Sequence, residues 1–521
     1  MNSTTWIILG TATLSLIFAA FKGDKSPEIN LDTATAGDLH LEACTVKIAS
    51  ERYAADCGLL VVPENRADEN SRLLSLPITR IRATGANPAE AIFHLEGGPG
   101  MSNMKAKPPK ALLEKHDFIM VGYRGVDGSV KLNCPEVSES LKGDSIDVLN
   151  EASRAGISTA MRQCAARLQK NSVDLNGYTI QEVIADMESA RSALAYKKIN
   201  LLSYSYGTRV AQFYAVHHPE SIHHSAMIGI NPPGHFVWEP NMIDAQIEQY
   251  SKRYAQTENP STPDLAQTLF EVSHNMPERW LFFKIDPGKV KSVSFALLFY
   301  RDTATMVFDA WLAAEQGDPS GLALMSLAYD LIIPKMSVYG EFFSKGISAD
   351  YDPERNYAAE MDPPNSIIGA PMSQLIWGSV TDDKGAAWPT ALMPEEYRNI
   401  QPSNTETLLI NGNLDFSTPA EYAAKELLPS LPNGKMITLA EMGHVNDIML
   451  RQPEAIERLL THFFLTGEAD DSLFTYDKMD FNTKMSFPLL AKIILGITTL
   501  GFSIIMLGVR KLVLKRKAKT T

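Results

Sequence analysis

The stretch INLLSYSYGTRVAQFYAVHHPE, residues 199–220, holds an apolar run, a tight corner at residues 203–207 and then a helical pattern. A strand that turns sharply into a helix can expose one hydroxyl at the corner, an arrangement called a nucleophile elbow. The usual elbow pattern is G-x-S-x-G, and this chain has Ser203 in place of the first glycine. The stretch predicts a strand over 199–203, a helix over 206–217 and Ser205 as a candidate nucleophile.

Around the elbow, short apolar strands alternate with helical patterns. Predicted strands cover 57–65, 73–83, 91–95, 117–123, 225–230, 407–411 and 435–439, and predicted helices cover 179–196 and 453–464. The first of these helices opens with Thr179 and Glu182 at capping-box spacing. Such alternation is typical of a mostly parallel sheet with helices on both faces. In residues 236–400 the alternation of strands and helices stops, and helical patterns such as 310–314 and 321–332 take its place. The sequence therefore predicts an α/β core in two halves, 40–235 and 401–468, with a helical cap at 236–400 and a polar linker over 22–42.

Two further groups follow Ser205 in the order that a catalytic triad needs. A serine hydroxyl is a weak nucleophile until a base takes its proton, and the base needs a partner that orients it. TLLINGNLDFSTP, residues 407–419, places Asp415 just past a predicted strand, and ITLAEMGHVND, residues 437–447, places His444 just past the next. The carboxyl ends of parallel strands meet at one crevice, so we expect Ser205, Asp415 and His444 to converge there.

The predicted reaction also needs backbone donors for a developing oxyanion. The first is the N–H of Tyr206, directly after the candidate nucleophile. The second is expected from HLEGGPG, residues 94–100, through Gly98, because glycine lets the backbone approach a substrate closely. An ordinary glycine-rich turn is the alternative for this loop.

Both ends of the 521-residue chain are apolar. Residues 6–21 form an apolar core followed by two lysines, which predicts a signal peptide or signal anchor over 1–25. Residues 485–509 are long and apolar enough to span a bilayer, and Lys492 can snorkel toward its surface. The basic tail, 510–521, is then expected in the cytoplasm and the main domain on the opposite side, periplasmic or extracellular.

Four cysteines occur as two pairs that are close in sequence. In an exported chain they predict the disulfides Cys44–Cys57 and Cys134–Cys164, with four unpaired thiols as the alternative. The C-x-x-C spacing of a metal site is missing, and no H-E-x-x-H motif accompanies the paired histidines, so no metal or other cofactor is expected. The net charge of −13 argues against a nucleic-acid partner.

Several motifs together resemble the proline iminopeptidase and tripeptidyl aminopeptidase family of α/β-hydrolases. They are GGPG at 97–100, YRGVDGS at 123–129, SYSYGTR at 203–209, NGNLDFSTP at 411–419 and GH at 443–444. The resemblance covers roughly residues 44–235 and 405–465. It implies an α/β-hydrolase fold and a serine exopeptidase that acts on peptides with a free N-terminus. Carried over by position, Ser205 is the nucleophile, Asp415 orients His444 as the base, and Gly98 with Tyr206 binds the oxyanion.

The chain departs from that family at three places. Ser203 replaces the first elbow glycine, Glu96 stands where His or Asn is usual, and Gly122-Tyr123 replaces an acidic-Gln pair. An aminopeptidase of this family must also hold a protonated α-amine, so we expect a carboxylate near the site. The candidates are Glu341, Asp350 and Glu96, each of which also fits a solvated surface position.

Two other functions fit the same motifs. A carboxylesterase or lipase-like enzyme uses the same triad, because triad chemistry does not separate esters from amides. A non-catalytic binding module on the hydrolase fold is the third possibility, although such proteins typically lack a triad member. The sequence leaves the residues removed per turnover and the side-chain preference open.

Overall fold

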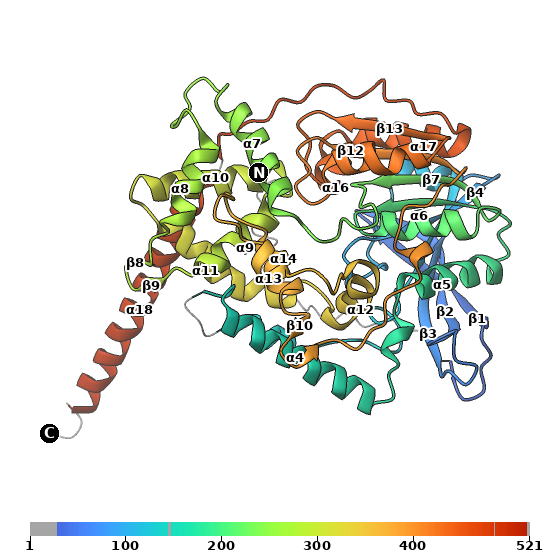
Figure 1. Cartoon of the computed structure of the whole chain (residues 1–521), viewed down its shortest axis with the longest axis horizontal. Coiled ribbons are helices and arrows are strands. Elements are labelled where there is room, and N and C mark those ends of the chain that lie inside the picture. The colour runs from blue at the N-terminus through green and yellow to red at the C-terminus, as the bar shows by residue number, and fades with distance from the viewer. Residues whose placement is uncertain (1–28, 144–146, 484, 518–521) are drawn as a thin grey trace.

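Alternating apolar strands and helices build one large sheet in the computed structural model, which describes residues 29–143, 147–483 and 485–517 (Figure 1). The strands of this sheet are β1 (Leu39–Ile48), β2 (Glu51–Pro63), β3 (Leu73–Ile81), β4 (Ala89–Leu95), β5 (His116–Val121), β6 (Ile199–Tyr204), β7 (Ile222–Ile228), β12 (Glu406–Gly412) and β13 (Gly434–Leu439). Their order is β1-β2-β3-β5-β4-β6-β7-β12-β13. The six strands from β5 to β13 are parallel, and β1, β2 and β3 are added antiparallel. The fold is that of an α/β-hydrolase with a mixed, mostly parallel sheet and a helical insert.

Helices cover both faces of the sheet because successive side chains on each strand point to opposite sides. Phe93 and Leu201 pack with α5 (Ile180–Ala193) and α6 (Gly207–His217) in one apolar cluster. Their neighbours Ile92 and Leu202 belong to a second cluster on the other face. That cluster includes side chains of the helices α2 (Lys110–Lys115), α16 (Val445–Arg451) and α17 (Pro453–Thr466).

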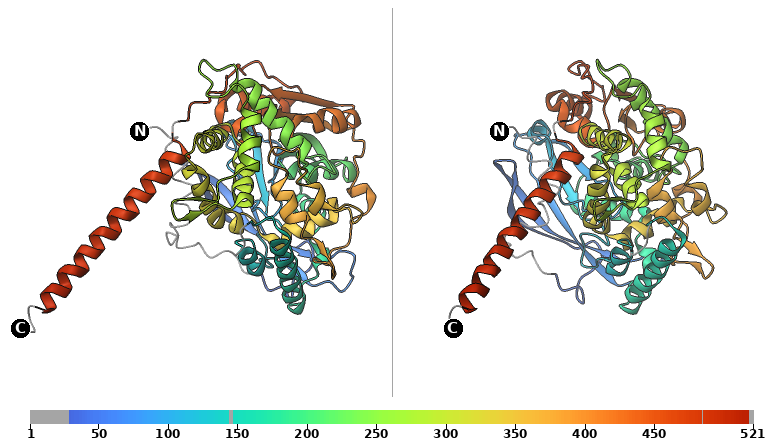
Figure 2. Two further views of the ribbon diagram at one scale, coloured as in Figure 1. Left: turned by 60° about the vertical axis from the view of Figure 1, so that its left-hand side comes forward. Right: turned by 90° about the vertical axis from the view of Figure 1, so that its left-hand side faces the viewer.

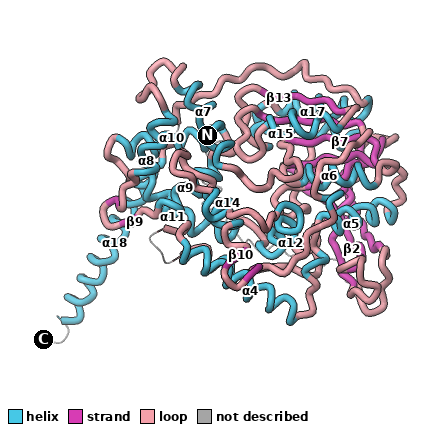
Figure 3. The backbone as a smooth tube through the Cα atoms, in the orientation of Figure 1, coloured by secondary structure: helices cyan, strands magenta, loops and turns pink. Residues whose placement is uncertain are grey.

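The insert between β7 and β12 is almost entirely helix and loop, and it lies beside the sheet (Figure 3). Its helices are α7 (Pro240–Tyr254), α8 (Leu265–His274), α9 (Pro287–Leu297), α10 (Arg301–Glu315), α11 (Ser320–Ile332), α12 (Tyr339–Asp350), α13 (Tyr357–Glu360) and α14 (Pro371–Trp377). Two small hairpins accompany them, β8–β9 (Arg279–Trp280, Phe283–Lys284) and β10–β11 (Thr381–Asp382, Gly385–Ala386). Short helical segments of three to five residues connect the longer elements: η1 (Leu175–Gly177), η2 (Ile333–Lys335), η3 (Glu395–Tyr397), α15 (Ala420–Tyr422), η4 (Ala423–Leu427) and η5 (Leu428–Ser430).

Strand β1 and helix α4 (Glu151–Lys170) are the two longest elements of the predicted core that were not expected from the sequence. Strand β1 begins at Leu39, inside the predicted linker 22–42, and pairs with β2 along its full length. Helix α4 follows α3 (Pro135–Ser140) and packs against the cap (Figure 1). There, Ser158 Oγ donates to the carbonyl of Ser379 at 2.7 Å, and Arg162 pairs with Asp382. The cap is therefore built from two parts of the chain, one on each side of the elbow.

Both predicted disulfides are present. Cys44–Cys57 links β1 to β2, and Cys134–Cys164 links the start of α3 to α4. The second disulfide closes a loop of 30 residues and ties α4 to the segment that follows β5. Disulfides of this kind are typical of proteins outside the cytoplasm.

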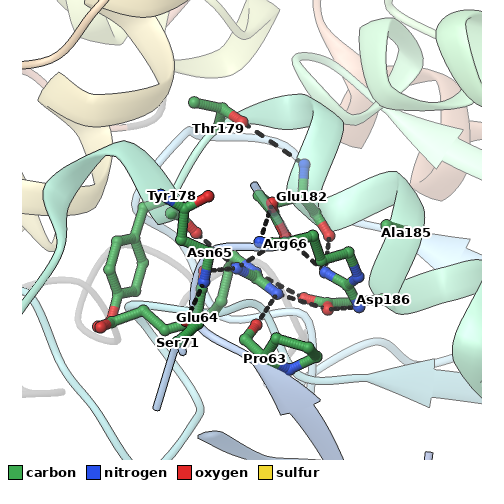
Figure 4. Close-up of polar contacts among 12 residues, drawn as sticks. Pro63, Glu64, Asn65, Arg66, Ser71, Tyr178, Thr179, Glu182, Ala185 and Asp186 are labelled. Carbon is green, nitrogen blue, oxygen red and sulfur yellow. Dashed lines mark hydrogen bonds and ion pairs between the residues drawn. The ribbon is translucent and has the colours of Figure 1, made fainter. Parts of the chain in front are cut away.

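A buried polar cluster fixes α5 against the end of β2 (Figure 4). Arg66 pairs with Glu182 and Asp186, and the Tyr178 hydroxyl donates to Glu64 at 2.5 Å. Thr179 caps α5 by accepting the N–H of Glu182, as the sequence predicts. The Glu182 carboxylate, however, binds Arg66, because a full ionic partner holds it more strongly than the backbone of Thr179 would.

The last helix, α18 (Phe487–Lys517), projects from the body of the molecule (Figure 2). Its part Phe487–Arg510 is the one unbroken helix among the described residues that is long and apolar enough to cross a membrane, and almost none of it is buried. The segment 1–25, predicted as a signal, lies outside the described residues, as does the end of the predicted basic tail, residues 518–521.

Candidate active site

Ser205 sits on a sharp turn between β6 and α6. Its φ of 49° lies in the left-handed region that non-glycine residues rarely adopt, and its N–H donates to the carbonyl of Ile228 at 2.9 Å. Two glycines make room for the turn. A Cβ added at Gly207 would lie 2.2 Å from the Leu95 carbonyl oxygen, and one added at Gly97 would lie 2.8 Å from the Ser205 Cβ. This geometry is that of a nucleophile elbow.

Ser203 occupies the position of the missing elbow glycine and is completely buried. Its hydroxyl donates to the carbonyl of Ala226 on β7 at 3.2 Å. A small side chain with a satisfied hydrogen bond fits here without an unpaired buried polar group. The departure from the glycine pattern therefore leaves the elbow intact.

Asp415 and His444 meet directly. The Asp415 Oδ2 lies 2.8 Å from His444 Nδ1, and the carboxylate also accepts the N–H groups of Ser417 and Thr418 and the Thr418 hydroxyl. A carboxylate held this firmly can fix the tautomer and orientation of an imidazole. The two loops approach closely because Gly412 has no side chain, since an added Cβ would lie 2.0 Å from the Met442 carbonyl oxygen.

The imidazole and the elbow come together at the end of β7. A Cβ on Gly229 would lie 2.9 Å from the His444 Cε1, and Gly229 directly follows Ile228, which accepts the Ser205 N–H. Within the described part of the chain, no hydrogen bond joins Ser205 Oγ to His444. Catalytic hydrogen bonds are often longer without substrate and tighten in the substrate complex.

The loop after β4 presents Gly98 beside the elbow, with a φ of 118° that favours glycine. Buried Asn103 holds this loop by accepting the Glu96 N–H at 2.8 Å and donating to the carbonyls of His94 and Val121. The Tyr123 hydroxyl donates to the Glu96 carbonyl at 3.0 Å. Tyr206 stands at the N-terminus of α6, where the first backbone N–H groups have no partner within the helix. The oxyanion role of Gly98 and Tyr206 stays a prediction.

The three candidate amine-binding carboxylates lie in different surroundings. The side chain of Asp350 is fully buried, pairs with Arg209 and accepts the Gly234 N–H at 3.0 Å. Glu341 is also fully buried and pairs with Lys345, while burial raises the pKa of its carboxyl. The structure thus gives both of these carboxylates an internal cation.

Glu96 differs, because 26% of its side chain is exposed. Its carboxylate accepts the Gly97 N–H at 2.9 Å and lies 3.3 Å from His94 Nε2. Burial raises the pKa of Glu96, but the hydrogen bonds from His94 and Gly97 and the positive charge available at His444 outweigh it, so the pKa is lowered overall. Of the three candidates, Glu96 is the one whose side chain is partly exposed, and the charge of His444 is among the causes that lower its pKa.

A clamp between the cap and the loop of His444 was not predicted. The carbonyl of Phe299 accepts the His444 N–H at 2.8 Å, and the Phe299 ring meets the imidazole edge-on, with centroids 5.6 Å apart. Asp447 Oδ2 accepts both the Gly443 N–H at 3.0 Å and the Arg301 N–H at 2.9 Å. The sequence signal for this clamp is weak, because only the short spacing from His444 to Asp447 places the carboxylate near the loop of the candidate base. The clamp gives the candidate base a backbone fixed from two sides.

Aromatic side chains of the cap surround the site. Phe236 contacts the Tyr206 ring, and Trp238 contacts Phe295, with centroids 4.9 Å apart in both pairs. The Trp238 Nε1 donates to the Ser417 carbonyl at 3.0 Å, which joins the cap to the loop of Asp415. Burial and nearby carboxylates raise the pKa of Tyr300 to about 12, so its phenol is neutral at ordinary pH. Among the described residues, no group of three His, Cys, Asp or Glu side chains is arranged to hold a metal ion.

Comparisons with known proteins show the fold family of this chain. Residues 90–446 match the model of the alpha/beta hydrolase fold family. Tripeptidyl aminopeptidase of Streptomyces lividans is 24% identical over 454 residues, which cover 80% of this chain and 82% of that protein. Serine protease Hip1 of Mycobacterium tuberculosis is 26% identical over 206 residues, 37% of this chain and 38% of that protein. Among solved structures, a serine hydrolase of Cycloclasticus zankles matches with a TM-score of 0.33 and 14% identity, covering 83% of this chain and all of that one.

Proposed function

Because the chain belongs to the alpha/beta hydrolase fold family and is a serine hydrolase distantly related to tripeptidyl aminopeptidases, we propose that it is a serine exopeptidase. It hydrolyses peptide bonds near the free N-terminus of peptides. The observation that carries this proposal is the Asp415–His444 pair beside the elbow of Ser205, in a chain that matches an aminopeptidase over 80% of its length.

The proposed mechanism follows from the positions of these groups. His444, oriented by Asp415, takes the proton of Ser205 Oγ as that oxygen attacks the peptide carbonyl. The N–H groups of Gly98 and Tyr206 stabilise the negative charge that develops on the carbonyl oxygen. His444 then gives the proton to the leaving amine, and an acyl-enzyme forms on Ser205. Water activated by His444 hydrolyses the acyl-enzyme and restores the serine.

Glu96 is the carboxylate we propose for the α-amine of the substrate. A partly exposed carboxylate with a lowered pKa stays ionised at neutral pH and attracts an ammonium group. An acetylated N-terminus carries no charge for it to bind. Glu341 and Asp350 are weaker candidates, because Lys345 and Arg209 already neutralise them.

The main alternative is a carboxylesterase or lipase-like hydrolase. Aromatic side chains, among them Trp238 and Phe299, surround the site. Such rings suit the apolar acyl group of an ester, and this favours the alternative. The triad itself is equally suited to both functions.

We further propose that α18 anchors the enzyme in a membrane, with the basic tail in the cytoplasm and the catalytic domain outside it. The disulfides support a location outside the cytoplasm. The length and apolar composition of Phe487–Arg510 support the span. In this arrangement 1–25 directs export, 40–235 and 401–468 form the core, and 236–400 forms the cap together with α4.

The test uses the purified full chain and its Ser205→Ala variant on three substrates: a peptide with a free N-terminus, its acetylated twin and a simple ester. We expect cleavage of the free peptide, at least about 100-fold slower cleavage of the acetylated one, and loss of about 10³-fold or more in the variant. Equal rates on both peptides would remove the requirement for a free N-terminus and with it the exopeptidase proposal, and turnover of the ester alone would replace it with an esterase. Unchanged activity of Ser205→Ala would overturn the triad itself.

A further inference from the structure

The cap exposes a cluster of large apolar side chains to solvent. We call it the apolar rim, and it consists of Leu281 and Phe282 at the β8–β9 turn, Leu327, Leu331 and Ile332 on α11, and Met336 just after η2. Phe282 is 71% exposed, Leu331 68% and Leu281 59%. Single exposed apolar residues are ordinary, but a gathered set of this size marks a surface that something covers.

The apolar rim lies where α18 leaves the body of the protein. Helix α11 packs against α18 and against both strands of the β8–β9 hairpin. The hairpin and α11 lie at the end of the cap from which α18 leaves the body (Figure 1). Two contacts hold the start of α18 against α11. Gly321 lies so close to Pro488 that an added Cβ would be 2.9 Å from it, and Lys492 pairs with Asp318 at 2.6 Å.

Beyond Lys492, α18 has almost no packing partner within the described residues. Ile493, Ile494, Ile497 and Leu500 are all exposed, each between 46% and 67%. An apolar helix with such a surface needs lipid around it. The bilayer surface is therefore expected close to Lys492, which puts it beside the apolar rim.

The chemistry of the rim suits a lipid surface. Trp280 stacks on Phe283, with centroids 5.8 Å apart, and aromatic rings of this kind are enriched at membrane interfaces. Arg279, Lys284 and Lys335 are exposed next to the apolar side chains. Basic side chains at the edge of an apolar surface attract anionic lipid headgroups.

From these observations we infer that the apolar rim docks on the bilayer that α18 enters, with its basic residues against anionic headgroups. This inference rests on the proposed membrane span of α18. It makes the cap, through α11 and the β8–β9 hairpin, a second membrane contact besides the anchor. The catalytic domain is then held in one orientation on the membrane instead of turning freely on its anchor.

The test measures lipid contact in the full chain, reconstituted into vesicles of phosphatidylcholine and phosphatidylglycerol. A single cysteine is introduced by Phe282→Cys or Leu331→Cys and labelled with an environment-sensitive fluorophore, while the four native cysteines are held in disulfides. Spin-labelled lipids then report contact by quenching. Ile497→Cys on α18 is the positive control, and Leu450→Cys, 66% exposed on α16, is the negative control.

We expect spin-labelled lipid to reduce emission at 282 and 331 by at least about twofold, comparably to 497, with no change at 450. Quenching at 497 without quenching at 282 and 331 would overturn the docking inference and leave the anchor standing. No quenching at 497 would overturn the anchor and the inference with it. Blue-shifted but unquenched emission at 282 and 331 would mean that protein, such as a second copy or the N-terminal segment, covers the rim instead.

Discussion

At the scale of single residues, Glu96 is the side chain that we propose to select the substrate of a triad that many enzymes share. It lies on the loop that carries Gly98, one of the two predicted oxyanion donors, and hydrogen bonds from His94 and Gly97 lower the pKa of its carboxyl. A carboxylate there strengthens binding of a cation and weakens binding of an anion. The choice between peptide and ester is therefore expected to depend on this side chain more than on the triad.

The variant Glu96→Gln tests this role. It keeps the size of the side chain and removes its charge, so we expect KM for a free-amine peptide to rise about 10-fold or more, with turnover of a neutral ester within about twofold. Glu454→Gln, an exposed carboxylate on α17, is the matched control and should change neither. Equal losses on peptide and ester would assign Glu96 to the loop geometry rather than to the amine.

Asp286 gives a pH-dependent stability that can be measured separately from activity. It caps α9 by accepting the Lys289 N–H at 3.0 Å, and burial raises its pKa from 3.8 to about 6. The folded protein therefore holds this proton more tightly than the unfolded chain does. At this group, stability is fully present below about pH 4 and falls as pH rises through about 6.

The variant Asp286→Asn keeps a good N-cap and removes the charge. We expect it to raise the free energy of unfolding at pH 7 by about 1–3 kcal/mol, and to have little effect at pH 4. Chemical denaturation of both proteins at the two pH values is the measurement. A variant that is less stable than the parent at pH 7 would contradict the assignment.

The residues of the site were largely predictable, but their surroundings were not. Chain order and position after strands were enough to single out Ser205, Asp415 and His444, because parallel strands bring their carboxyl ends together. The sequence did not show which of Glu96, Glu341 and Asp350 is free to bind an amine. That choice depends on the partners Lys345 and Arg209, which pair with two of them. Arg209 comes from a distant part of the chain, and nothing local in the sequence assigns it to Asp350.

At the level of elements, the clamp at Asp447 connects the cap to the loop of the candidate base. One carboxylate oxygen holds the backbone of Gly443 on one side and of Arg301 on the other. A Cβ on Gly443 would lie 2.5 Å from the Phe299 carbonyl oxygen, so the two segments are in close contact. The cap is therefore expected to affect catalysis through the position of His444 as well as through substrate binding.

The variant Asp447→Ala removes both hydrogen bonds and is expected to lower kcat by about 10- to 100-fold with little change in KM, because His444 loses its fixed position. Asp447→Asn keeps one acceptor oxygen and should restore most of kcat. Steady-state kinetics of both variants, with thermal unfolding as a check on folding, separates positioning from a general loss of structure. A proportional loss of folded protein in both variants would contradict a positioning role.

Strand β1 and helix α4 were not predicted because the apolar pattern of each is weak in the sequence. Strand β1 alternates exposed and half-buried side chains as an edge strand, so its apolar signal is weak, and the disulfide to β2 helps to hold it. Helix α4 buries Ile157, Met161 and Leu168, but small residues such as Ala160 and Ala165 fill much of its buried face, so its apolar pattern is weak in the sequence. Strands buried on both faces, such as β6 and β12, gave the clearest patterns.

On the scale of the whole molecule, the Cys134–Cys164 disulfide ties α4, the part of the cap that precedes the elbow, to the start of α3. Replacing both cysteines by alanine frees a loop of 30 residues in the unfolded chain, which is expected to lower the free energy of unfolding by about 3–4 kcal/mol. Denaturant unfolding of the double variant against the parent measures this loss. An unchanged midpoint would mean that packing of α4 alone secures the cap.

The most direct test of the whole account asks whether Ser205 becomes covalently modified. The full chain is treated with a fluorophosphonate that reacts with activated serines, then digested, and the adduct is located by mass spectrometry. We expect one adduct, on the peptide that contains Ser205, lost in Ser205→Ala, strongly slowed in His444→Ala and slowed by excess free-amine peptide. An adduct on another serine, or labelling that is the same in His444→Ala, would contradict the proposed triad.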